Sequence, residues 1–245
     1  MKMSIVTAVY NREKTIGNAM RCLQAQSFSN YEHIIIDGAS RDGTVAEIEQ
    51  LADHRTRLVS EPDNGIYDAI NKGLALAERD VIGLLHSDDL LADDQVLKRV
   101  ADAFEREKCL LIYGDLDYIS NSTGRTIRRW RAGSFHPRRL RQGWMPPHPT
   151  VFAVRSLFEE LGVYDTSYRI AADYEAMLRY FKAHGNRALY IPETLVRMRL
   201  GGASNKSAGA IIRKMKEDYR SLQRHKVGGL RTLLRKNISK ITQFV

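Results

Sequence analysis

The chain has 245 residues, 43% of them hydrophobic, which is enough apolar material for one large domain with a packed core. Its formal net charge is +9, yet no stretch approaches the ~20 consecutive apolar residues of a membrane-spanning helix, and no secretory signal precedes the first strand-like segment. The two cysteines, Cys22 and Cys109, exclude a disulfide framework and a thiolate metal site, so we expect a reduced cytoplasmic protein.

The first half of the chain alternates between β-rich and helical segments. The β-rich segments predict strands at residues 4–10, 31–37, 56–60 and 81–85. Between them, apolar residues spaced three and four apart predict helices at residues 13–25, from residue 44 onward, and at 66–77. Parallel strands need crossovers of this kind, so the alternation predicts a largely parallel sheet with helices packed on its faces.

The alternation continues to about residue 120 and then stops. Residues 94–106 are predicted as a helix, and the segments 110–113 and 116–120 as two strands. Residues 122–150 are rich in arginine and in turn residues and show no regular period. The remaining predicted elements are strands at 151–154, 189–191 and 195–199, and helices at 155–161 and 172–184.

Polar turn residues follow four of the predicted strands. Any one of these turns alone would be an ordinary strand ending. The carboxyl ends of parallel strands lie along one edge of a sheet, where open α/β folds bind their ligands. The four turns together therefore predict a single ligand cleft, and they are residues 10–12, 37–43, 61–65 and 87–89.

Two adjacent acids, Asp88 and Asp89, end the predicted strand at residues 81–85. Neighbouring carboxylates repel each other at the end of a core strand, and a bound cation would relieve this repulsion. The glycine-rich loops that usually cradle phosphate are absent from the sequence. We therefore expect the two acids to hold a divalent metal and, through it, a diphosphate.

Taken together, four segments of the sequence resemble glycosyltransferase family 2. They are Val-Thr-Ala-Val-Tyr-Asn at 6–11, Ile-Ile-Asp-Gly-Ala-Ser-Arg-Asp-Gly-Thr at 35–44, Ser-Glu-Pro-Asp-Asn-Gly-Ile-Tyr-Asp-Ala-Ile-Asn-Lys-Gly at 60–73, and Ser-Asp-Asp at 87–89. The resemblance spans roughly residues 3–200. It implies the GT-A fold, a Rossmann-like, mixed, mainly parallel α/β sheet flanked by helices, and transfer from a nucleotide sugar with inversion.

The resemblance also divides the chain into three parts. Residues 1–120 are expected to form the half that binds the nucleotide sugar. Residues 121–205 are expected to bind the acceptor and supply the catalytic base, as the second half of the same domain. Residues 206–245 form a basic helical tail.

For the donor, the resemblance implies a UDP-sugar, because Asp37 matches the family acid that binds the uracil ring. Asp89 matches the direct ligand of a Mn²⁺ or Mg²⁺ ion, and Asp88 the residue near the ribose and the metal. Lys72 also has an ordinary reading as a solvated cation near a helix end. The remaining matches on the nucleotide side are Thr7, Val9, Tyr10, Tyr67, Asn71 and Ser87.

Inverting transfer needs a base to take the proton of the acceptor hydroxyl. Asp173 matches the family's base position, and Glu175 is the fallback. Asp173 has an alternative reading as a helix-capping residue. Arg197 and Arg199 are candidates to bind the diphosphate. No histidine lies between residues 186 and 224 to serve as a third metal ligand, so water or diphosphate oxygens would complete the shell.

The acceptor is expected to be a saccharide or a lipid-linked saccharide, in surface polysaccharide or glycolipid synthesis, and the transferred group a hexose or an N-acetylhexosamine. Trp144 and His148 are candidates for its pocket, because aromatic faces suit sugar rings and imidazoles bond hydroxyls. A histidine between prolines is equally well read as structural. Donor sugar, acceptor and oligomeric state stay open.

The net charge lies entirely in the tail. Residues 206–245 hold 11 basic and 2 acidic residues, whereas the rest of the chain balances at 27 of each. A second excess of positive charge lies between Arg125 and Arg141, where seven arginines occur without an acid. Two local basic regions favour an anionic surface or substrate and argue against a nucleic-acid binder.

Apolar residues of the tail recur on one helical stripe from Leu230 to Val245, passing through Leu233, Leu234, Ile238 and Ile241. A basic amphipathic helix suits the anionic cytoplasmic face of a membrane, so we expect peripheral contact there. The alternative is packing on the protein's own body or in a dimer.

Two other functions compete with a glycosyltransferase. A nucleotidyltransferase would share a similar fold, but its basic glycine-rich opening loop is absent from residues 11–16. A non-catalytic nucleotide- or nucleic-acid-binding protein would leave the acids at 37, 88, 89 and 173 without a common purpose.

Overall fold

A computed structural model describes residues 1–199 and 208–239 of the chain. Within them, a nine-stranded mixed sheet runs in the order β3-β2-β1-β4-β8-β6-β9-β5, and β7 pairs with β6 outside this path. The predicted alternation of the first half is confirmed: β1, β2, β3 and β4 are parallel neighbours. These strands and their crossover helices are β1 (Met3–Val9), α1 (Ile16–Gln24), β2 (Tyr31–Asp37), α2 (Thr44–Leu51), β3 (Thr56–Ser60), α3 (Ile66–Leu76) and β4 (Val81–Leu84).

The second half continues the same sheet with both strand directions. β8 is antiparallel to β4 and β6, whereas β9 runs parallel to β6. Its elements are β5 (Leu90–Leu91), α4 (Val96–Arg106), β6 (Leu111–Ile119), β7 (Thr126–Trp130), α5 (Pro137–Leu140), η1 (His148–Thr150), β8 (Phe152–Val154), α6 (Arg155–Leu161), α7 (Ala172–His184), η2 (Gly185–Arg187) and β9 (Ala188–Arg199).

The core lies on both faces of this sheet. β1 is buried along its whole length, and its side chains alternate between the two faces. Val6 packs in a cluster with the apolar residues of α3 and α7, whereas Ile5 packs with those of α1 and α4. Helices therefore cover the sheet from both sides, as expected for strands with so few polar residues.

The second half is more regular than the sequence predicts. The two strands predicted at 110–113 and 116–120 are one strand, β6, whose register against β9 shifts around Asp115. The strands predicted at 189–191 and 195–199 likewise merge into β9. β7 lies where no regular structure was predicted. Within it, the Arg128 guanidinium lies over the aromatic rings of Tyr118 and Trp130. Arg128 and Arg129 occupy positions of β7 that in other strands often carry apolar residues, so the strand cannot be recognised from its hydrophobic pattern.

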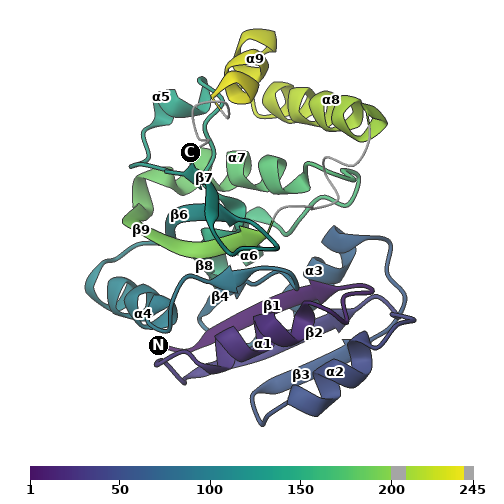
Figure 1. Cartoon of the computed structure of the whole chain (residues 1–245). Coiled ribbons are helices and arrows are strands. Elements are labelled where there is room, and N and C mark those ends of the chain that lie inside the picture. The colour runs from purple at the N-terminus through teal and green to yellow at the C-terminus, as the bar shows by residue number, and fades with distance from the viewer. Residues whose placement is uncertain (200–207, 240–245) are drawn as a thin grey trace.

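The tail forms two helices, α8 (Ala208–Arg224) and α9 (Leu230–Ile238), which pack over α7 at the end of the molecule opposite β3 and α2 (Figure 1). The apolar residues of α9, predicted to form one stripe, differ in their exposure. Leu233 is buried, whereas Leu230, Leu234 and Ile238 are exposed. The predicted positions Ile241 and Val245 lie outside the described residues. No helix in the described ranges has the length and apolarity to cross a membrane.

Candidate active site

A cleft of about 1560 Å³ lies against the carboxyl ends of β1 and β4. The start of α3, the segment before α7, β7 and α9 enclose it. Residues of three of the four predicted turns, 10–12, 61–65 and 87–89, line the cleft, whereas no residue of the turn at 37–43 does. Ten of the sequence-predicted site residues line this cleft: Val9, Tyr10, Tyr67, Ser87, Asp88, Asp89, Trp144, His148, Asp173 and Arg199.

Asp89 is the most strongly perturbed group of the cleft. Its side chain is 1% exposed, and its Oδ2 atom has no hydrogen-bond partner within residues 1–199 and 208–239. Burial and the neighbouring charge of Asp88 raise the pKa of the Asp89 carboxyl well above its usual value, although the backbone N–H of Arg199 donates to it. A buried carboxylate oxygen without a partner at the wall of a cleft is suited to a cation.

The donor set around Asp88 and Asp89 fits a cation that keeps part of its shell for other ligands. Among residues 1–199 and 208–239, no histidine, cysteine or further acid joins Asp88 and Asp89 as a third possible metal ligand. Two carboxylates with remaining positions for water and phosphate oxygens are typical of Mg²⁺ sites.

Asp37 lies just behind the cleft and is fully buried. Its carboxylate accepts hydrogen bonds from the backbone N–H of Ser40 (2.9 Å), from the Ser40 hydroxyl and from the Ser60 hydroxyl (2.7 Å). Gly38 follows, and a Cβ atom there would lie 2.4 Å from an Asp63 oxygen. The missing side chain at Gly38 thus lets Asp63 approach the end of β2.

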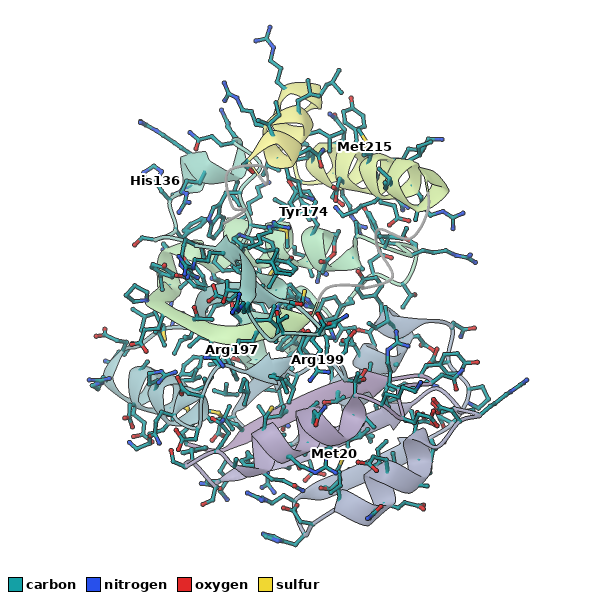
Figure 2. All side chains as sticks on the ribbon, in the orientation of Figure 1. Met20, His136, Tyr174, Arg197, Arg199 and Met215 are labelled. Carbon is teal, nitrogen blue, oxygen red and sulfur yellow. The ribbon has the colours of Figure 1, made fainter. Side chains whose placement is uncertain are left out.

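Four further predicted residues are absent from the lining of the cleft, as far as the described part of the chain shows it. Thr7 donates to the Leu85 carbonyl inside the core (2.7 Å), and Asn71 exchanges two hydrogen bonds with the backbone of Tyr164. The Lys72 ammonium pairs with Glu61 (2.7 Å) and donates to Pro62, which agrees with the ordinary reading of this lysine. Arg197, which Figure 2 labels near Arg199, is exposed on β9 and is absent from the lining of the cleft.

Asp173 lies in the first turn of α7 and faces the cleft. Its Oδ1 atom accepts the Tyr174 backbone N–H (2.8 Å) and lies 3.3 Å from the Tyr67 hydroxyl. The backbone N–H groups of residues 169–171, which precede the helix, donate to the Glu217 carboxylate of α8. Glu217 thus binds donors just before the helix, whereas Asp173 itself accepts a first-turn N–H, so its reading as a helix-capping residue stands beside its position at the cleft.

Glu175, the fallback base, is buried away from the cleft. Its carboxylate pairs with Arg179 (2.9 Å) and His225 (2.8 Å). Burial favours the neutral form of Glu175, but the hydrogen bonds from His225 and Arg179 outweigh it and lower the pKa of this carboxyl. A permanently paired carboxylate behind the wall is a poor proton acceptor for a substrate.

Two histidines meet at the floor of the cleft. The rings of His86 and His148 are 5.8 Å apart, and His148 Nε2 lies 2.7 Å from the Tyr164 hydroxyl. Burial lowers the pKa of His148 to about 4, so its imidazole is neutral at pH 7. His86 is not among the sequence-predicted site residues, because alternation along an extended segment would point it away from Ser87. The turn at Asp89, whose N–H bonds the His86 carbonyl, changes that direction.

The opposite wall of the cleft is basic. Trp144 donates its indole N–H to Ala132 and lies under the Arg139 guanidinium. Ten arginines and lysines line the cleft against four aspartates, so it suits anionic ligands. The sequence shows the arginine cluster and the basic tail separately, but only the fold brings them to one wall, where they contribute Arg128, Arg129, Arg131, Arg139, Lys214, Arg235 and Lys236.

Comparison with known proteins identifies the family. The sequence profile of glycosyl transferase family 2 matches residues 4–190. A PGL/p-HBAD biosynthesis glycosyltransferase of Mycobacterium bovis is 34% identical over 188 residues, which are 73% of this chain and 69% of that protein.

Among solved structures, TarS of S. aureus in complex with UDP-GlcNAc superimposes with a TM-score of 0.73 and 17% identity, over 93% of this chain and 66% of that one. A mannosyltransferase of Pyrobaculum calidifontis, PcManGT, solved with GDP-Man and Mn²⁺, gives a TM-score of 0.63 and 19% identity, over 91% of this chain and 63% of that one. These likenesses confirm the predicted GT-A-like fold. The profile match and the relative of Mycobacterium bovis show that this chain is a glycosyltransferase that belongs to glycosyl transferase family 2.

Proposed function

We propose that this chain transfers a sugar from a nucleoside diphosphate sugar, in the first place a UDP-sugar, to a hydroxyl of a saccharide or lipid-linked saccharide with inversion. The observation that carries the proposal is the pairing of two unlike acidic sites in one cleft. Asp88 and Asp89 lie on the wall after β4, and Asp173 lies on the wall formed by α7. The first site suits a metal-bound diphosphate and the second a proton acceptor.

On the donor side, Val9, Tyr10 and Asp37 would hold the base, with Tyr67 and Ser87 along the nucleotide. Asp89 and Asp88 would hold Mn²⁺ or Mg²⁺, which when bound stabilises the negative charge of the departing diphosphate. The Arg199 guanidinium, which lines the same cleft, would add positive charge beside that group. The UDP-GlcNAc, GDP-Man and Mn²⁺ in the complexes of the structural neighbours support this assignment.

On the acceptor side, Asp173 would take the proton of the attacking hydroxyl. The acceptor oxygen forms a bond to the anomeric carbon as the bond from that carbon to the diphosphate breaks, so a single displacement inverts the configuration. The Tyr67 hydroxyl, 3.3 Å from Asp173 Oδ1, would hold the carboxylate toward the cleft. General-base assistance of this kind is worth ~10²–10⁴ in rate.

The acceptor half of the cleft favours a sugar that carries negative charge. Trp144 offers an aromatic face, and the neutral imidazole of His148 bonds to the Tyr164 hydroxyl. The surrounding arginines suit a phosphate-linked acceptor. The PGL/p-HBAD relative belongs to glycolipid synthesis by its name, which supports a hexosyl- or N-acetylhexosaminyltransferase of surface polysaccharide or glycolipid synthesis.

The three predicted parts remain our division of the chain by function. Residues 1–120 would bind the donor, residues 121–205 the acceptor, and residues 206–245 would contact an anionic membrane at its cytoplasmic face. Exposed apolar side chains on α8 and α9, among them Ile212 and Leu230, support the membrane contact.

Titration calorimetry with a panel of UDP- and GDP-sugars, with and without Mn²⁺, tests the donor assignment. We expect UDP-sugars to bind more tightly with Mn²⁺, and Asp89→Asn to lose that gain, whereas Asp94→Asn, an exposed acid on the same segment, keeps it. Asp173→Asn should bind the donor normally and lose transfer. Equal affinities with and without metal, or full transfer by Asp173→Asn, would contradict the respective assignment.

A further inference from the structure

The helical tail, α8 and α9, holds the segment that carries Asp173. Residues 206–245 contain only two acids: Glu217 binds the residues just before α7, and Asp218 pairs with Lys236, which lies over the ring of Tyr174 in the first turn of α7. In a tail with 11 basic residues, this use of both acids is unlike a merely solvated surface helix.

Glu217 binds the backbone immediately before α7. Its Oε1 atom accepts the N–H of Arg169 (3.1 Å), and its Oε2 atom accepts those of Ile170 and Ala171 (2.9 Å each). These are donors at a helix N-terminus, where a carboxylate is favoured both by hydrogen bonding and by the helix dipole. The carbonyl of Ile170 in turn accepts the Tyr67 hydroxyl (2.8 Å), the same hydroxyl that approaches Asp173.

Asp218 is linked through Lys236 to Tyr174, the residue that follows Asp173. It is fully buried and pairs with Lys214 (3.0 Å) and Lys236 (2.7 Å). The Lys236 ammonium lies 3.1 Å from the centre of the Tyr174 ring, which is a short cation–π contact. Tyr174 lies beneath the tail helices, between them and the sheet (Figure 2).

A third contact holds the next turn of α7. His225, at the end of α8, pairs with Glu175 (2.8 Å), and its carbonyl accepts the Lys182 ammonium (2.8 Å). The residues on both sides of Asp173 are thus held by the tail, whereas the Asp173 side chain itself stays open to the cleft.

We propose that the helical tail positions the base, with Glu217 as a positioning residue for Asp173. This inference rests on the proposed role of Asp173. Proton transfer depends on a carboxylate held at hydrogen-bond distance from the acceptor hydroxyl, and a displacement of 1 Å costs about 10²-fold in rate. The tail is therefore a wall of the active site in addition to any contact it makes with a membrane.

The test is Glu217→Gln in the full chain, with Glu49→Gln as the matched control. Gln keeps the size of the side chain but loses the charge and one acceptor atom. Glu49 is an exposed residue of α2. We expect Glu217→Gln to lower kcat of transfer by ~10- to 100-fold with unchanged affinity for UDP and Mn²⁺. The control should match the unsubstituted chain in both quantities.

A double variant separates positioning from general destabilisation. In the Asp173→Asn background, Glu217→Gln should lower the residual rate no further, because a residue that acts through Asp173 has no effect without it. The inference is overturned if Glu217→Gln keeps full kcat, or if it slows the Asp173→Asn variant by the same factor. If Asp173→Asn alone retains full transfer, the proposed base is wrong instead.

Should Glu217→Gln fail to fold, Glu217→Asp gives the same test. Asp keeps the charge but shortens the reach to the N–H groups of residues 169–171. We expect a smaller fall in kcat, again with unchanged donor affinity and again absent in the Asp173→Asn background. A fall that persists in that background would overturn the inference.

Discussion

His33, buried on β2 in the first half of the chain, and His148, in the wall of the cleft, are neutral imidazoles. The Thr7 hydroxyl donates its single hydrogen to the Leu85 carbonyl, so it must accept from His33 Nε2, 2.9 Å away. This fixes the tautomer of His33 with its hydrogen on Nε2. Burial lowers the pKa of each imidazole from 6.5 to about 4. Both imidazoles are therefore uncharged in the folded chain at pH 7.

This has a consequence for stability against pH. Below pH 6.5 the unfolded chain binds protons at these histidines, whereas the folded chain does so only near pH 4. Unfolding therefore takes up protons, and the free energy of unfolding should fall as pH drops from 6.5 to 4, by ~1.4 kcal/mol per pH unit for each histidine. Denaturant titrations at pH 7, 6 and 5 measure the slope.

The matched variant is His33→Gln, which removes one of the titrating groups. Between pH 6.5 and 5, the slope of the unfolding free energy against pH should then correspond to about one proton fewer. It should stay above zero, because burial also lowers the pKa of His148 and of His86. Carboxylates with a lowered pKa, such as Glu175, also stabilise the folded chain, but they lose this contribution only at lower pH, where the carboxylates of the unfolded chain begin to bind protons. An unchanged slope in His33→Gln would contradict the neutral buried state.

At the scale of elements, the sequence predicted what depends on local pattern. The strand ends after β1 and β4 bring Tyr10 and Asp89 to one edge because parallel strands share a direction. Thr7 was assigned to the same edge, but it lies within β1 and turns inward to Leu85. The contact of Glu217 with Ala171 spans 46 residues and depends on how α8 docks, which no local period encodes.

Gly143 is the point where α9 meets the body of the protein. Its φ angle is +83°, and a Cβ atom there would lie 2.8 Å from both the Lys236 nitrogen and the Thr232 carbonyl oxygen. These are backbone atoms of α9 and cannot turn aside. We expect Gly143→Ala to displace α9 and to cost ~2–4 kcal/mol of folding free energy, with faster hydrogen exchange across residues 224–239.

Gly124→Ala is the control for this substitution. Gly124 has a similar φ angle of +68°, but a Cβ atom there meets nothing within 4 Å. Its cost should be limited to the left-handed backbone, ~1 kcal/mol. If the two variants lose equal stability, the contact of Gly143 with α9 contributes nothing beyond backbone strain. Since Lys236 reaches Tyr174, Gly143→Ala should also slow transfer, whereas Gly124→Ala should not.

At the scale of the whole molecule, the helical tail has two unlike faces. The inner face carries Asp218, Leu222 and Leu233 into the protein interior. The outer surface carries apolar side chains: seven of the ten large apolar side chains that are exposed in the described ranges belong to α8 and α9, and all of these but Ile238 lie outside the cleft wall. They are Ile211, Ile212, Met215, Tyr219, Leu230, Leu234 and Ile238. Packing on the body and contact with a membrane are therefore compatible, because they use different faces.

Deleting the tail is consequently a poor test of membrane contact, because it would also remove Glu217 from the base segment. Substitution of the outer face avoids this. Ile212, Leu230 and Leu234 are each at least half exposed and lie outside the cleft wall. At ~1 kcal/mol for each buried apolar side chain, changing all three to Ser should lower partition onto vesicles by about 10²-fold.

The measurement is cosedimentation with vesicles that contain anionic lipid, at low and at high salt. We expect binding by the unsubstituted chain, weakened by salt and by neutral lipid, since exposed arginines such as Arg213 and Arg231 attract the surface. The triple variant should stay in solution yet keep its transfer rate on a water-soluble acceptor. Val163→Ser, exposed but outside the tail, should bind as before. If the triple variant still sediments with vesicles, or if the unsubstituted chain instead dimerises through this face, the apolar surface serves another contact than lipid.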